Sequence, residues 1–160
     1  MTRIIQLLII GFAIILNSFS YSQTNKTPEI GIEIEKASYS LGVQVALSVK
    51  KDKLVIEPNA IEKAFKDVFE GNELVISEEE SMEVLQAFGK HDALSLEETE
   101  KVSYSLGVFL ASRTKAQGWS TIVGREFVKA FKDVLEGNKL EVSEEESESV
   151  LREYNKKVKH

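Results

Sequence analysis

Few residues in this chain have the types and spacing that acid–base or nucleophilic chemistry needs. The two histidines are His91, which lies next to Asp92, and His160 at the end of the chain. Neither has a partner at a spacing that would orient it, so a solvated position is the better interpretation. The sequence has no nucleophile elbow, no Gly-rich phosphate loop and no metal-spaced His pair. We therefore expect no catalytic residue, no metal site and no cofactor.

Two acidic runs are the strongest candidates for a metal site. Residues 78–80 and 144–146 are each three consecutive Glu, and each run follows a Ser. Calcium loops instead need alternating oxygen ligands on a turn with a central Gly. Consecutive Glu on a helix point in different directions, and they favour the positive end of the helix dipole. The runs therefore predict solvated first turns of helices.

Four other polar residues stand at matching positions in the two halves of the chain. Asp67 and Asp133 interrupt apolar faces, where a structural hydrogen bond or an ion pair with a Lys is expected. Tyr39 and Tyr104 could be functional, but a half-buried phenol that anchors its helix is the better interpretation.

These matches arise because the chain contains a tandem duplication, which fixes the architecture. The offset between copies is 65 residues for the first block and 66 for the other two, so a loop of altered length is expected near 53–57. The matching blocks are 35–43 with 100–108, 63–72 with 129–138, and 77–81 with 143–147.

Apolar spacing predicts three helices in each repeat. The first helix is expected over about 33–51 and about 96–117, the second begins at Pro58 in copy one, and the third follows Ser77 or Ser143. We expect an all-α fold of two tandem three-helix repeats, packed as a pseudo-two-fold helical bundle. Gly71 and Gly137 fit the left-handed position after the second helix, Ser95 and Glu98 fit a capping box, and Gly118 and Trp119 fit a C-terminal cap.

The first helix also carries a stripe of small residues spaced by four. Gly inside a helix costs up to ~1 kcal/mol relative to Ala, so its recurrence needs a reason. Two hypotheses explain it: the two first helices cross each other at Gly42 and Gly107, or each Gly makes room for Phe65 or Phe131 of its own repeat. The stripe comprises Ser38, Gly42, Ala46, Ser103, Gly107 and Ala111, and the expected core comprises Leu41, Val45, Phe65, Val68, Phe69, Leu106, Leu110, Phe131, Val134 and Leu135.

The ends of the chain predict export. Residues 1–22 read as a signal peptide with Arg3, an apolar run too short to span a membrane, and cleavage expected before Gln23. The chain contains no Cys, which excludes disulfides, and its net charge of −6 argues against nucleic acid as a partner. The expected divisions are a flexible leader over 23–32, repeats over 33–94 and 95–155, and a basic tail over 156–160.

Both repeats resemble a known family. The segments Lys-Ala-Ser-Tyr-Ser-Leu-Gly at 36–42 and Ala-Phe-Lys-Asp-Val-Phe-Glu-Gly at 64–71, followed by Ser-Glu-Glu-Glu at 77–80, look like the helical domain N-terminal to FKBP-type peptidyl-prolyl isomerases, including the macrophage infectivity potentiator proteins. The resemblance implies dimerisation, in which two modules intertwine their first helices. With both copies on one chain it suggests an intramolecular version, and it offers no positions for an isomerase site.

We therefore expect a non-catalytic exported protein, in the bacterial periplasm or secreted, that serves protein folding as an interaction or chaperone-like module. Its partner would be an unfolded client protein or an FKBP-type isomerase with the same helical domain. No nucleic acid and no stable membrane anchor after signal cleavage are expected, and a monomer with an internal pseudo-dimer is one possible state. The alternatives are a structural, self-associating envelope protein and an accessory subunit that pairs with a separate isomerase.

Overall fold

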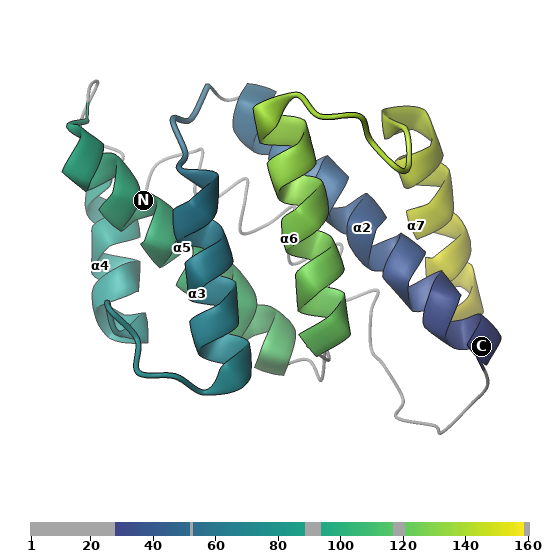
Figure 1. Ribbon diagram of the computed structural model, residues 1–160, viewed down its shortest axis with the longest axis horizontal. Coiled ribbons are helices and arrows are strands. Elements are labelled where there is room, and N and C mark those ends of the chain that lie inside the picture. Colours follow the sequence, from purple (N-terminus) through teal and green to yellow (C-terminus); the bar gives the residue numbers. More distant parts are fainter. Residues whose placement is uncertain (1–27, 52, 89–93, 117–120, 159–160) are drawn as a thin grey trace.

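The computed structural model describes residues 28–51, 53–88, 94–116 and 121–158. These residues form six α-helices, and none of them lies in a strand, so the all-α prediction is confirmed (Figure 1). The helices are α2 (Pro28–Lys51), α3 (Pro58–Glu70), α4 (Glu78–Phe88), α5 (Leu96–Ala116), α6 (Thr121–Glu136) and α7 (Glu144–Val158).

The spatial order of the helices differs from their order along the chain. They lie side by side in the order α4, α5, α3, α6, α2 and α7, and each neighbouring pair in this order packs together (Figure 1). The first helix of each repeat therefore packs on the second and third helices of the other repeat. We call this arrangement the helix exchange; it relates the two halves by a pseudo-two-fold axis between α3 and α6.

Local sequence signals set where the helices start and end. Ser95 and Glu98 form a reciprocal capping box before α5, in which Glu98 N–H donates to Ser95 Oγ at 3.2 Å and Ser95 N–H donates to Glu98 Oε2 at 2.8 Å. Ser77 and Glu80 form the same box before α4. Gly71 and Gly137 both have φ of 75°, the left-handed conformation that Gly adopts without a Cβ penalty.

One boundary differs from the expectation. Helix α2 begins at Pro28 rather than near Glu33, so residues 28–32 are helical instead of belonging to the flexible leader. Proline suits a first helical turn because its missing N–H has no partner there in any helix. The loop expected near 53–57 is present between α2 and α3, and Lys53 adopts a positive φ of 54°.

Several expectations fall outside the described residues. These are the signal peptide over 1–22, the first part of the leader, the cap at Gly118 and Trp119, and both histidines, His91 and His160. Among the helices that the structure describes, none is long and apolar enough to cross a membrane.

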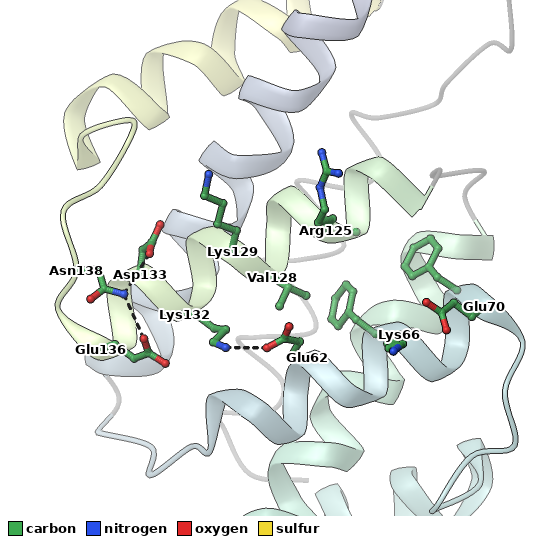
Figure 2. A pocket seen from close by; sticks show the side chains of 13 residues that line it. Glu62, Lys66, Glu70, Arg125, Val128, Lys129, Lys132, Asp133, Glu136 and Asn138 are labelled. Atoms are coloured by element: carbon green, nitrogen blue, oxygen red, sulfur yellow. Dashed lines mark hydrogen bonds and ion pairs between the residues drawn. The ribbon is translucent and has the colours of Figure 1, made fainter.

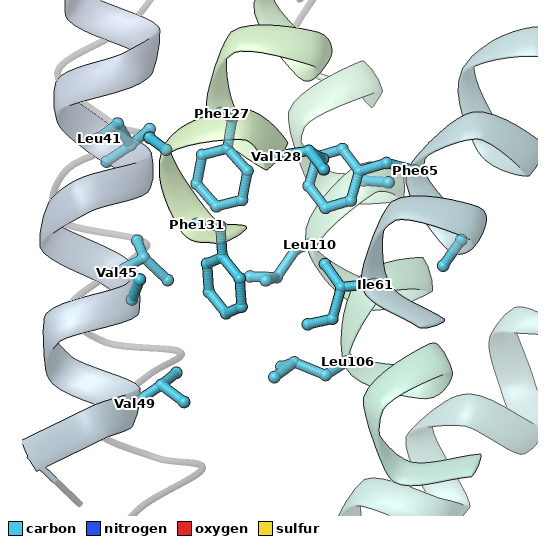
Figure 3. Close-up of a cluster of buried hydrophobic side chains, with 14 of the residues drawn as sticks. Leu41, Val45, Val49, Ile61, Phe65, Leu106, Leu110, Phe127, Val128 and Phe131 are labelled. Carbon is cyan, nitrogen blue, oxygen red and sulfur yellow. The ribbon is translucent and has the colours of Figure 1, made fainter. Parts of the chain in front are cut away.

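A single hydrophobic core joins the two repeats. Phe65 of α3 stacks on Phe127 of α6 with ring centroids 5.1 Å apart, at the junction of the two halves. Burying such a side chain contributes roughly 1.5–3 kcal/mol. Figure 3 shows the side chains that meet there: Leu41, Val45 and Val49 from α2, Ile61 and Phe65 from α3, Leu106 and Leu110 from α5, and Phe127 and Phe131 from α6. The two repeats thus form one folded unit rather than two separate domains.

Of the residues expected in the core, most are buried and two are partly buried. The buried ones are Leu41, Val45, Phe65, Val68, Leu106, Leu110, Phe131 and Val134, and the partly buried ones are Phe69 and Leu135.

Candidate interaction site

The two glycines of the small-residue stripe are points of close helix approach. A Cβ placed on Gly42 would lie 2.3 Å from the carbonyl oxygen of Phe127 and 2.8 Å from Cβ of Ala130, both in α6. A Cβ on Gly107 would lie 2.6 Å from Cβ of Ala64 in α3. Only Gly fits such contacts, because atoms at these distances overlap and the neighbour is backbone or a short side chain.

This geometry corrects both explanations offered for the stripe. Gly42 and Gly107 do not meet at a crossing of α2 with α5, because α2 packs on α6 and α5 packs on α3. Nor do they make room for the Phe of their own repeat, since each faces the second helix of the other repeat. Two such exchanged crossings replace the single crossing between first helices.

The remaining stripe residues lie along the same crossings. Ser38, Ala46, Ser103 and Ala111 are each no more than 1% exposed. Ser38 Oγ donates to the carbonyl oxygen of its own helix at Ile34 (2.6 Å). Small side chains that satisfy their polar atoms within their own turn let the partner helix pack without an unpaired buried group.

Two reciprocal hydrogen-bond networks fasten the exchanged helices. The Tyr39 hydroxyl of α2 donates to Asp133 Oδ2 of α6 at 2.7 Å, and it accepts from Glu141 N–H at 3.0 Å. The Tyr104 hydroxyl of α5 donates to Asp67 Oδ2 of α3 at 2.8 Å, and it accepts a backbone N–H from the connection that follows α3. We call these the tyrosine–aspartate locks; each joins a first helix to the other repeat.

The locks shift the pKa values of their members. Burial, reinforced by the neighbouring carboxylate, raises the pKa of the Tyr39 and Tyr104 phenols to about 12. Burial on its own would raise the pKa of Asp67, but hydrogen bonds from Lys63, Tyr104 and Asn72 outweigh it and lower that pKa below its usual value. Both phenols therefore stay neutral donors at neutral pH, and Asp67 stays an ionised acceptor.

An open groove of about 560 Å³ runs along the seam between α3 and α6 (Figure 2). Apolar side chains of Phe65, Phe69 and Val128 line it, together with charged residues from both helices. Gly124 also lines it, and a Cβ there would come within 2.9 Å of the Phe69 ring. We call this feature the seam groove; its lining mixes apolar and charged side chains.

The pseudo-two-fold axis relates the two ends of the seam, but their charges differ. At one end Lys132 Nζ of α6 contacts Glu62 Oε2 at 2.7 Å (Figure 2). The same Nζ contacts Asn59 Oδ1 at 3.2 Å. At the other end the matching Lys is Lys66 of α3, and the positions that match Glu62 and Asn59 hold Val128 and Arg125. Lys66 makes no hydrogen bond or ion pair with any residue that the structure describes.

Sequence reasoning missed the pairing of Tyr with Asp across repeats and the seam groove. Tyr39 with Asp133 and Tyr104 with Asp67 recur at matching positions, which was a signal that the residues of each pair serve one purpose. The groove had a different signal: Glu62 is replaced by Val128 just before the block of the second helix that repeats. Within the described ranges, no group of three or more metal-ligating side chains gathers closely enough to hold an ion.

Comparisons with known proteins place the chain in a family. Neither the curated proteins nor the solved structures contain a significant match. One family model matches twice, over residues 34–101 and 99–160, and it is described as the domain amino terminal to FKBP-type peptidyl-prolyl isomerase. Because these matches span most of the sequence and follow the two repeats, the chain belongs to the FKBP N-terminal domain family as two tandem copies.

Proposed function

We propose that this chain is a non-catalytic, exported protein-binding module that works as a monomer in protein folding. The observation that carries the proposal is the helix exchange, closed within one polypeptide. Each first helix already packs on the second and third helices of the other repeat, and these are the helices that would receive the first helix of a partner. A partner therefore binds the outer surface of the module without displacing a helix.

The strength of the exchange supports this role over pairing by helix swapping. To admit the first helix of another protein, the chain would have to break a tyrosine–aspartate lock and separate a crossing at Gly42 or Gly107. Removing one partner of a buried hydrogen bond alone costs about 1–3 kcal/mol. Binding at the seam groove avoids this cost, because the groove is already open.

The non-catalytic part of the proposal rests on what the described residues do. The polar side chains that sequence reasoning singled out, Asp67, Asp133, Tyr39 and Tyr104, hold helices together in the locks. The family match covers the helical domain that accompanies isomerases, over residues 34–160. In this proposal the chain assists folding by holding proteins rather than by isomerising prolyl bonds.

Light scattering, client aggregation and prolyl isomerisation test the proposal on one preparation of the mature chain. We expect a monomer at all concentrations, suppressed aggregation of a chemically unfolded client protein, and an isomerisation rate equal to the uncatalysed rate. A dimer that forms with rising concentration would favour the self-associating alternative. Catalysed isomerisation, or client aggregation that is unchanged by excess protein, would refute the proposal.

A further inference from the structure

The seam groove contains one lysine, Lys66, that lacks the ion pair of its pseudo-symmetric counterpart. At one end of the α3–α6 seam, the carboxylate of Glu62 lies 2.7 Å from Lys132 Nζ, and both residues line the groove. At the other end, which we call the open end, Lys66 occupies the matching place, and Val128 occupies the place of the carboxylate. The open end therefore lacks the acid that its pseudo-symmetric counterpart has.

Neighbouring charges around the open end are already engaged. Arg125 pairs with Glu126 at 3.0 Å, and Lys129 pairs with Glu141 at 2.5 Å. Glu70, one turn after Lys66 on α3, accepts from Asn72 at 3.3 Å. Lys66 is exposed and is the one lysine lining the groove that has no carboxylate within ion-pair distance among the described residues.

The floor beside Lys66 is apolar. Phe69 is only partly buried and stacks on Phe65 with ring centroids 6.1 Å apart. The Phe69 ring packs against Gly124, where a Cβ would come within 2.9 Å of the ring, whereas the matching position in the first repeat holds Pro58. The open end of the seam therefore combines a partly exposed aromatic side chain with a lysine that has no ion pair among the described residues.

We propose that the seam groove binds a protein segment in which a large apolar side chain is followed by an acidic residue. The apolar side chain packs on Phe69 and Val128, and the carboxylate takes the place at Lys66 that Glu62 takes at Lys132. This inference deepens the proposed protein-binding role and rests on it. Complementarity to the unpaired Lys66, rather than the net charge of the groove, favours an acidic residue over a basic one at this place.

The test is a charge swap measured by fluorescence anisotropy on the full mature chain. The probes are three short fluorescein-labelled peptides in a Gly-Ser frame, with the centres Leu-Phe-Glu, Leu-Phe-Lys and Leu-Ser-Glu. The wild-type chain should bind the Leu-Phe-Glu peptide roughly fivefold or more tighter than either of the others. The variant Lys66→Glu should reverse the order of the Glu and Lys peptides.

The matched control is Lys51→Glu, which makes the same charge change on an exposed residue of α2. It should keep the wild-type preference. Lys66 is exposed, so its substitution leaves the core intact, and circular dichroism confirms that each variant is folded. Equal binding of all three peptides to the wild-type chain, or the same preference in Lys66→Glu, would overturn the groove assignment.

Client aggregation separates failure of this inference from failure of the proposed function. If Lys66→Glu suppresses client aggregation as well as the wild-type chain and also keeps its peptide preference, the groove assignment is wrong and the protein-binding role stands. If the wild-type chain neither suppresses client aggregation nor binds any of the peptides, both the groove assignment and the protein-binding role are refuted.

Discussion

Gly42 and Gly107 determine how closely the exchanged helices approach. Each lies where an added methyl group would overlap the backbone or the Cβ of the partner helix. Sequence spacing predicted that these glycines serve a close helix contact, because an interior Gly repeated in both copies is otherwise costly. It could not identify the partner helix, since a stripe of small residues fits any helix that presents a complementary ridge.

Substitution of Gly42 by Ala should lower the free energy of unfolding by roughly 2 kcal/mol. Ala gains up to ~1 kcal/mol of helix propensity, but the new Cβ would lie 2.3 Å from the Phe127 carbonyl oxygen, and a backbone atom cannot move away cheaply. Denaturant titration measures the change. The control Ser48→Ala, on the exposed side of the same helix, should stay within about 0.5 kcal/mol of wild type, and an equal effect of both variants would contradict the close contact.

Replacement of Tyr104 by Phe should destabilise the protein more than replacement of Tyr39 by Phe. Both variants keep the ring and remove a hydroxyl that donates to a carboxylate and accepts a hydrogen bond from a backbone N–H. Asp67, the partner of Tyr104, is 6% exposed, whereas Asp133 is only partly buried and can recruit water. We expect losses of about 2 and about 1 kcal/mol, measured by denaturant titration. The reverse order would show that burial of the carboxylate does not set the strength of the lock.

The same phenols predict how stability changes at alkaline pH. Their pKa is raised from 10.0 to about 12 in the folded protein, so the folded state holds these protons more tightly than the unfolded state does. Their contribution is therefore complete below pH 10 and is lost as the pH rises from 10 to 12. Denaturant midpoints across this range should fall for the wild-type chain and fall less for the Tyr39→Phe, Tyr104→Phe double variant. Parallel curves for the two proteins would contradict the assigned pKa shift.

At the scale of helices, the sequence predicted where each helix lies in the chain better than it predicted which helices pack together. Capping residues such as Ser77 and Ser95 and the left-handed Gly71 act within a few residues of chain, so the pattern around them suffices. The exchange is different, because the two second helices carry the same residues over 63–68 and 129–134, so the local pattern does not show which of them α2 packs on. The choice between them depends on chain connection and on the whole core, which local pattern does not contain.

Cutting the chain between the repeats tests the exchange directly. A protease site inserted between Phe88 and Leu94 lies outside all six described helices. After cleavage, α2 should remain held by α6 and α7, and α5 by α3 and α4. We expect the fragments to co-elute in size-exclusion chromatography with unchanged helical circular dichroism, and to separate only in denaturant. Uncleaved protein with the same insert is the control, and two separately eluting folded fragments would rule out the exchange.

The whole molecule has one core although it has two repeats. The core runs from Leu85 in α4 at one edge to Leu151 in α7 at the other, through the Phe65–Phe127 stack at the centre. A repeat of about 60 residues is only marginally stable by itself, so its length favours a core that both repeats share. The asymmetry of the seam, by contrast, could be recognised only from the structure, which places Lys132 against Glu62 and Lys66 beside Val128.

Because the two repeats share one core, a destabilising substitution in one half should lower the stability of both halves. Gly42 lies at the α2–α6 crossing, remote from α4 in the order of helices (Figure 1). If the molecule unfolds as one unit, Gly42→Ala should lower amide hydrogen-exchange protection of the slowest sites in α4 as much as in α7, since both exchange through the same global opening. Calorimetric and van't Hoff enthalpies should also agree, as a two-state transition requires.

The reciprocal variant Gly107→Ala is the matched control for this experiment. It changes the α5–α3 crossing and should lower protection in α4 and α7 alike, although α7 belongs to the other half. Loss of protection confined to α2, α6 and α7 in Gly42→Ala, and to α3, α4 and α5 in Gly107→Ala, would mean that the halves open independently. In that case the Phe65–Phe127 stack and the rest of the α3–α6 seam would be too weak to couple them, and a partner at the seam groove would bind two loosely joined bodies.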